Sequence, residues 1–187
     1  RGIVVRNNLF HDMGGPYGGS GWFLLIGDAP RDLVFDHNTI SSSSNAIVVA
    51  YGGTREDPKE ILGFRFTNNA ARHSKYGING QSFSFGNDVI RHYFPDSTIT
   101  ANYLAGGSPS RYPAGNLTEG AFELEFVDAE GGDFRLRANS QLRGKATDRG
   151  DIGADMGTLL TRVTDVEAGL PGVSVPTVPT NFRIVSR

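Results

Sequence analysis

Short apolar runs alternate with polar turns along most of this chain, and four of the runs end in the same way. Each has alternating side chains, then an asparagine, then a mainly apolar residue two positions later; the segments are 3–10, 33–40, 64–71 and 97–104. The asparagines recur every 30 to 33 residues, at Asn8, Asn38, Asn69 and Asn102. A repeat of this length with one buried polar position per copy is typical of a solenoid, in which each copy is one coil.

A second strand is predicted after each asparagine, at 22–26, 47–51, 78–81 and 122–126, and each of these begins just after a small residue. Strands about 30 residues apart cannot be partners in a tight hairpin. We therefore expect parallel pairing between neighbouring coils, with strands about 4.8 Å apart. The pattern predicts an all-β parallel β-helix of about four to five coils.

Side-chain alternation assigns the two faces of each strand. On the second strands we expect three residues of each coil to point inward: Trp22, Leu24 and Ile26 in the first coil, Ile47, Val49 and Tyr51 in the second, and Phe122, Leu124 and Phe126 in the fourth. The outward positions are then Phe23, Leu25, Val48 and Ala50, followed by Asn79 and Gln81, and finally Glu123 and Glu125. An apolar outer strip at Phe23, Leu25, Val48 and Ala50 needs a cover, so we expect an N-terminal part of the same protein, loop 11–20 or another protomer to dock there.

The repeat stops after residue 127. Residues 133–140 and 150–154 read as a non-repeating end piece, which a solenoid needs to protect its last coil. Three prolines in the tail favour an extended linker. We therefore expect coils and a terminal segment over 1–156 and an extended tail over 157–187. The chain starts at Arg1 directly in strand sequence, so we expect further coils before it.

Composition narrows the partners of the chain. Its 187 residues carry 18 basic and 20 acidic side chains, for a net charge of −2, so no overall field attracts nucleic acid. No apolar run approaches the roughly 20 residues of a membrane span. There is no cysteine, which excludes disulfides and thiolate metal sites and leaves the redox compartment open.

The segments around Asn8, Asn38 and Asn69, and more loosely Asn102, resemble the repeat of the right-handed parallel β-helix (pectin-lyase-like) family. The stretch from Phe126 to Ala154 is similar to the terminal segment of many bacterial members. The resemblance covers residues 1–156. It implies an all-β, right-handed parallel β-helix, and members that act on carbohydrate place the substrate on an outward sheet face and its bordering loops.

Two basic and aromatic segments fit such a groove. Residues 72–76 follow Asn69, and residues 91–93 follow the third outward strand. In a polysaccharide lyase of this family a Lys, Arg or His takes a proton next to a uronate carboxyl and a cation neutralises that carboxyl. The candidate catalytic residues are His73, Lys75, Arg91 and His92, with Tyr76, Asn79 and Gln81 as substrate-binding residues. The alternative is that these are ordinary surface side chains.

Glu123 and Glu125 share one face of a predicted strand, about 6.6 Å apart along the backbone. This separation suits an inverting hydrolase pair, for which carboxylates lie about 6.5–9.5 Å apart. The alternative is that Glu123 and Glu125 are ordinary solvent-exposed surface residues. No cofactor is predicted: no phosphate loop, dinucleotide fingerprint or metal-ligand spacing is present, and Ca²⁺ has no supporting motif.

The resemblance therefore implies a secreted or cell-surface protein that recognises a polysaccharide. We expect it not to bind nucleic acid and to have no membrane span. The sequence leaves open whether the protein is a lyase or hydrolase acting on an acidic glycan. The alternative is a non-catalytic structural or adhesive solenoid that docks a partner through the apolar outer strip.

Overall fold

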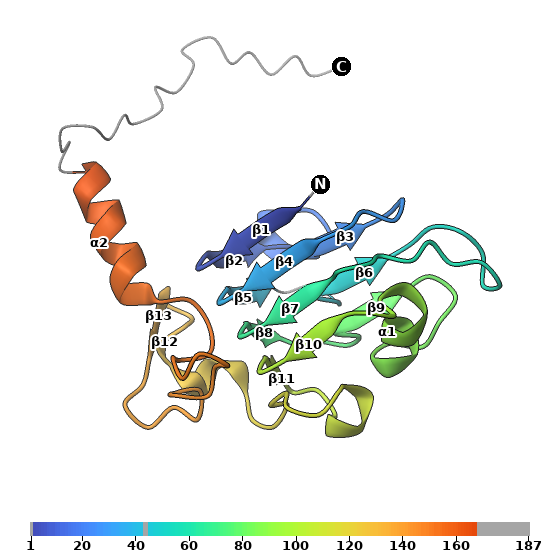
Figure 1. Cartoon of the computed structure of the whole chain (residues 1–187). Helices are drawn as coiled ribbons and strands as arrows, with labels where there is room; N and C mark the ends of the chain where they lie inside the picture. The colour runs from blue at the N-terminus through green and yellow to red at the C-terminus, as the bar shows by residue number, and fades with distance from the viewer. Residues whose placement is uncertain (1, 43–44, 168–187) are drawn as a thin grey trace, which may run out of the picture.

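The chain folds as a parallel β-solenoid of about three turns (Figure 1), in a computed structural model that describes residues 2–42 and 45–167. Three parallel sheets run along the stack. Sheet 1 has the order β1-β4-β7-β10, sheet 2 has the order β2-β5-β8-β11, and sheet 3 has the order β3-β6-β9. Equivalent strands of successive coils therefore pair with each other, as the repeat predicts.

The strand bounds follow the repeat closely. Sheet 1 contains β1 (Ile3–Arg6), β4 (Leu33–Asp36), β7 (Arg65–Thr67) and β10 (Thr98–Thr100). Sheet 2 contains β2 (Leu9–Met13), β5 (Thr39–Ser42), β8 (Ala70–Arg72) and β11 (Tyr103–Ala105). Sheet 3 contains β3 (Leu24–Ile26), β6 (Val48–Ala50) and β9 (Ile78–Gly80), and β12 (Phe126–Asp128) pairs antiparallel with β13 (Asp133–Leu136). The helical elements are η1 (Gly15–Tyr17), α1 (Asn87–Tyr93), η2 (Pro109–Arg111), η3 (Phe122–Glu125) and α2 (Met156–Glu167).

The repeated asparagines form a hydrogen-bonded ladder inside the corner between sheets 1 and 2. The Nδ2 group of Asn38 donates to Asn69 Oδ1 at 2.9 Å, and that of Asn69 donates to Asn102 Oδ1 at 3.0 Å. The backbone N–H of each donor residue reaches the same oxygen, and the second amide hydrogen satisfies a carbonyl of the previous coil. Because buried polar groups need partners, this ladder fixes the register of the stack. Asn116 continues it as a fifth rung, accepting from Asn102 at 2.9 Å.

The residue before each ladder asparagine makes the turn between the sheets. Asn7, His37, Asn68 and Ala101 all have positive φ, between 51° and 57°. Asparagine tolerates this left-handed conformation better than most residues, whereas alanine is strained in it. In each Asn-Asn or His-Asn pair, the first side chain therefore leaves the corner and the second enters the ladder.

A continuous apolar core fills the bore of the solenoid, and α1 packs against its last coil. Val89, Ile90 and Tyr93 of α1 are buried in the same cluster as Ile78 of β9. Tyr112 enters the cluster from the segment after β11. These elements cover the core at the end of the stack that follows β9 and β10.

The prediction of four to five coils was too high. After β11 the chain leaves the repeat, and residues 122–125 of the predicted strand form the 3-10 helix η3, while Phe126 begins β12. Its period of three residues places Phe122 and Glu125 on the buried side and leaves Leu124 63% exposed. The assignment of Leu124 as inward and Glu125 as outward was therefore wrong.

The predicted apolar outer strip was wrong at Phe23, Val48 and Ala50, whereas Leu25 is exposed as expected. Val48 and Ala50 are completely buried, pair with Leu24 and Ile26, and belong to the core, while Val49 faces outward. Residues 47–50 are all apolar, so no alternation specified which face was inside. Phe23 packs against Phe10 and Phe35, with ring centroids 4.7 and 5.6 Å apart.

The first coil keeps several apolar side chains exposed. Val4, Leu25 and Ile3 are 68%, 56% and 55% exposed, and Trp22, which was expected inside, is 41% exposed. In the second coil, Tyr51 was also expected inside and is 41% exposed. Docking of a partner on the first coil stays a prediction.

The end piece returns along the outside of the corner between sheets 1 and 2. Thr147 N donates to Asn68 Oδ1 at 2.8 Å, Ala154 N to Thr39 Oγ1 at 2.9 Å, and Asp155 N to Asn7 Oδ1 at 2.6 Å. Residues 147–155, which we call the return segment, thus cross the third, second and first coils in turn. A second apolar cluster, including Tyr103, Phe126 and Ile152, lies beneath the end piece.

The return segment leads into α2, so residues 157–167 are helical where an extended tail was expected. The rest of the predicted tail lies outside the described residues. Across the described part of the chain, none of the helices has the length and apolar character required to cross a membrane.

Candidate functional site

His73 is buried beneath the loop that follows β8. It is 4% exposed, and both ring nitrogens have partners in the protein: Nδ1 lies 2.9 Å from the Ser74 carbonyl oxygen and Nε2 lies 2.6 Å from the Tyr112 hydroxyl. The Tyr112 oxygen also accepts the backbone N–H of Ile78 at 3.3 Å. Burial lowers the pKa of His73, against the opposing effect of its bond to Ser74. The neutral ring with a proton on Nδ1 satisfies all three contacts.

Lys75 and Tyr76 lie on a surface that also includes Phe85 and Arg111. The Tyr76 and Phe85 rings are half-buried, with centroids 6.0 Å apart in an edge-on arrangement. The Lys75 ammonium lies 4.9 Å from the Tyr76 centroid, and the Arg111 guanidinium lies 4.6 Å from that of Phe85. We call these four residues the cation–aromatic surface.

The two cations of the cation–aromatic surface, Lys75 and Arg111, have no carboxylate partner among residues 2–42 and 45–167. A side-chain hydrogen bond with Tyr76 raises the pKa of Lys75, which keeps its amine protonated at neutral pH. The surface therefore combines two half-buried rings with two cations.

Arg91 and His92 belong to a neighbouring cluster on α1. Arg91 forms an ion pair with Asp88 at 3.0 Å, and His92 Nδ1 lies 2.7 Å from the Asp88 carbonyl oxygen. The His92 ring stacks on Phe83 with centroids 4.0 Å apart. Phe83 and Phe85 lie on the same loop between β9 and α1, so the two predicted basic segments border one loop from different elements.

The remaining predicted binding residues are dispersed. Asn79 is half-buried on the outer face of β9, and Gln81 is exposed just after that strand. Glu123 forms an ion pair with Arg72. Glu125 is 6% exposed and accepts hydrogen bonds from Ser140 at 2.6 Å and Gln141 at 2.7 Å, so it is held within the end piece.

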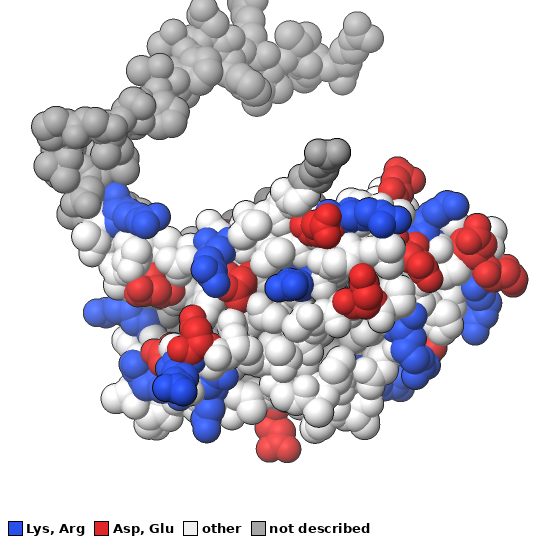
Figure 2. Space-filling model, viewed as in Figure 1, with Lys and Arg blue, Asp and Glu red and all other residues white. Residues whose placement is uncertain are grey.

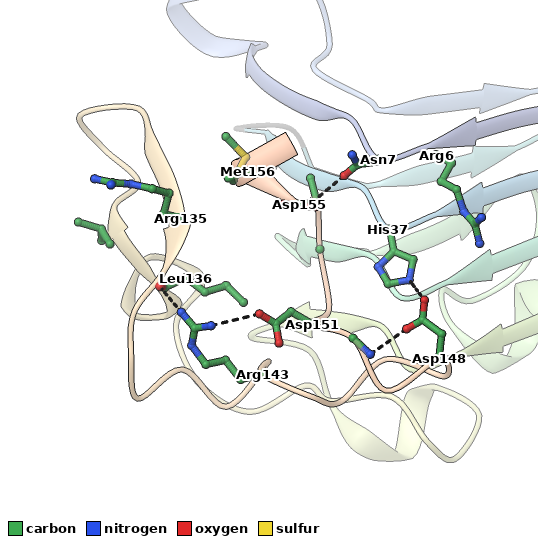
Figure 3. A pocket seen from close by; sticks show the side chains of 15 residues that line it. Arg6, Asn7, His37, Arg135, Leu136, Arg143, Asp148, Asp151, Asp155 and Met156 are labelled. Carbon is green, nitrogen blue, oxygen red and sulfur yellow. Dashed lines mark hydrogen bonds and ion pairs between the residues drawn. The ribbon is translucent and has the colours of Figure 1, made fainter. Parts of the chain in front are cut away.

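A cleft of about 890 Å³ lies between the corner of the coils and the end piece (Figure 3). Arg6, Asn7 and His37 come from the coil side, while Arg143, Asp148 and Asp151 come from the end piece. Figure 3 shows His37 and Asp148 pointing toward each other, as do Arg143 and Asp151, whereas Arg135 points away from these pairs. Val127, Leu136 and Met156 add apolar surface.

Most of the charged side chains that line the cleft are paired within the protein, and Asp155 accepts hydrogen bonds from Thr158 instead. His37 Nε2 lies 3.1 Å from Asp148 Oδ2, and Arg143 lies 3.2 Å from Asp151. The backbone N–H of Gly150 lowers the pKa of Asp148, and His37 adds to this effect. Hydrogen bonds from Thr158 lower the pKa of Asp155 at the start of α2. Asp148 and Asp155 are therefore ionised at neutral pH, and neither is suited to act as a general acid.

Sequence reasoning missed this cleft because its two walls are far apart in the chain. His37 and Asp148 are separated by 111 residues, and Asn7 and Asp155 by 148. One signal was present: a polar residue that tolerates positive φ stands before three of the ladder asparagines. That position marks a side chain directed away from the core.

Positive and negative side chains are mixed over the molecular face seen in Figure 2, both on the coils and on the end piece. Such a surface has no large field of one sign.

No family model, characterised protein or solved structure matches this chain.

Proposed function

We propose that this protein recognises an acidic glycan on the cation–aromatic surface of Lys75, Tyr76, Phe85 and Arg111. The observation that carries the proposal is the combination of two half-buried rings with two cations that lack a carboxylate partner within the described residues. An aromatic ring packs against the apolar face of a pyranose, and the cations complement a uronate carboxylate. The resemblance of the asparagine repeat to pectin-lyase-like proteins supports the same substrate class, and we propose a secreted or cell-surface location on that basis.

The chemistry of the surface favours binding over turnover. A lyase needs a base that can accept a proton, but Lys75 stays protonated and His73 is buried with both nitrogens in hydrogen bonds. His92 is stacked on Phe83 and Arg91 is paired with Asp88. In this proposal His73 positions the loop that carries Lys75 and Tyr76.

The size of the cationic cluster favours a glycan over nucleic acid. A protein that binds the phosphate backbone of nucleic acid commonly neutralises about six or more phosphates. Two unpaired cations and a net charge of −2 suit a ligand with one or two carboxylates.

Calorimetric titration with a uronate oligosaccharide and its carboxyl-reduced counterpart tests the proposal. We expect binding of the acidic form only, with Lys75→Ala and Arg111→Ala each weakening it by about tenfold, since a hydrogen bond to a charged group contributes about 1.5–3 kcal/mol. Arg65→Ala is the matched control, because Arg65 is an exposed cation on β7 outside this surface. Equal binding of the two ligands, or equal loss in Arg65→Ala, would overturn the proposal.

A further inference from the structure

We infer that the cleft between the coil corner and the end piece is a second binding site, and that its ligand is a neutral saccharide. This inference is independent of the cation–aromatic surface, because none of the four residues of that surface lines the cleft. Its volume of about 890 Å³ falls in the range of about 300–1,000 Å³ that is common for ligand sites.

The balance of charge in the cleft determines the ligand class. Three arginines and three aspartates line it, together with His37. Arg6 is paired with Asp36 at 2.6 Å, and Arg135 with Asp133. Arg6, Arg135, Arg143, His37, Asp148 and Asp151 each lie beside a group of opposite charge, whereas Asp155 accepts hydrogen bonds from Thr158. The cleft therefore offers little net attraction to an anion or a cation.

Hydrogen-bonding capacity remains after these pairs are made. Arg143 donates to the carbonyls of Arg137 and Leu136 and to Asp151, which uses three of its five N–H groups. Asp151 accepts from Arg143 and from the Gly144 N–H, and an ionised carboxylate has about four acceptor sites. Adjacent donors and acceptors of this kind match the vicinal hydroxyls of a sugar, each of which both donates and accepts.

Apolar surface lies beside these polar groups. Val127, which is 45% exposed, and Leu136 stand on β12 and β13, opposite the start of α2. A saccharide has apolar C–H faces as well as hydroxyl edges, so it can occupy both parts of the lining. A ligand without an apolar face would leave Val127 and Leu136 in contact with water.

The fold also fixes the walls of the cleft relative to each other. The return segment is anchored to three coils through Asn68, Thr39 and Asn7, which fixes one wall relative to the other. A site with both walls fixed loses little conformational entropy when it binds a ligand.

Calorimetric titration of the full chain with cellotetraose, xylotetraose, mannotetraose and maltotetraose tests this inference. The informative variant is Val127→Trp, which places a large side chain in the cleft without removing a buried contact. Its control is Leu124→Trp, because Leu124 is 63% exposed, lies three residues earlier in η3 and does not line the cleft.

We expect at least one of the four tetrasaccharides to bind the wild type, with affinity reduced at least about tenfold by Val127→Trp and unchanged by Leu124→Trp. Absence of binding by all four would overturn the inference. So would equal affinity in Val127→Trp and the wild type, or an equal loss in both tryptophan variants. Circular dichroism of each variant establishes that it is folded.

Discussion

Replacing one inner asparagine by alanine tests whether the ladder holds the coils in register. The Asn69 side chain makes four hydrogen bonds: Oδ1 accepts from the Asn38 backbone N–H and from Asn38 Nδ2, both at 2.9 Å, and Nδ2 donates to the Phe35 carbonyl and to Asn102 Oδ1. Asn69 is completely buried, so water cannot replace these partners.

The expected loss follows from this count. A buried hydrogen bond contributes about 0.5–1.5 kcal/mol net, and each buried donor left without a partner costs about 1–3 kcal/mol. We therefore expect Asn69→Ala to lower the free energy of unfolding by about 3–5 kcal/mol. The control is Asn8→Ala at the first coil, where Nδ2 donates to Arg6 O and Asn38 Oδ1 and the residue is only half-buried; we expect about 1 kcal/mol.

Urea denaturation followed by circular dichroism measures both values. The reasoning would be refuted if Asn69→Ala cost less than about 1 kcal/mol, or if both variants cost the same. Either result would mean that backbone pairing and apolar packing alone maintain the register.

Three further predictions concern backbone strain and pH. Ala101 is held at φ 52°, so Ala101→Gly is expected to raise the free energy of unfolding by about 0.5–1 kcal/mol in the same assay, and a loss of stability would contradict the strain argument. Burial lowers the pKa of His73, so below about pH 6.5 the unfolded state binds a proton that the folded state does not. The free energy of unfolding should therefore decrease as pH falls through this range. His73→Gln should make that decrease smaller. Burial raises the pKa of Asp36, but hydrogen bonds from Thr67, Arg6 and Asn68 outweigh it and the net pKa is lowered, so its contribution is present above about pH 4 and lost below. Asp36→Asn should therefore cost about 1–3 kcal/mol at pH 7 and less in acid, and an equal cost at both pH values would exclude this linkage.

The periodic asparagines allowed the sheets and much of the register to be predicted, because one buried amide per coil imposes the same geometry on every copy. The face of the second strand could not be predicted at residues 47–50, where every side chain is apolar. The change from strand to 3-10 helix at Phe122–Glu125 depends on burial of Phe122 and Glu125 within the end piece, and local alternation does not record it.

The candidate sites were predictable only in part. Lys75 and Tyr76 do stand beside each other on the surface, but Phe85 and Arg111 join them through loops after β9 and β11. His73 was predicted as a candidate base from the sequence, whereas in the structure it is buried and bonded to Tyr112, which lies 39 residues later. The cleft depends on contacts between the first and last thirds of the described chain and has no local motif.

The most direct test of the proposed function is a two-dimensional NMR titration of the labelled protein with a uronate oligosaccharide. Saturable shifts of the backbone amides of Lys75, Tyr76, Phe85 and Arg111, and their absence with the carboxyl-reduced ligand, are the predicted result. Shifts confined to other surfaces, or no shifts at saturating ligand, would contradict the assignment of this surface as the acidic-glycan site.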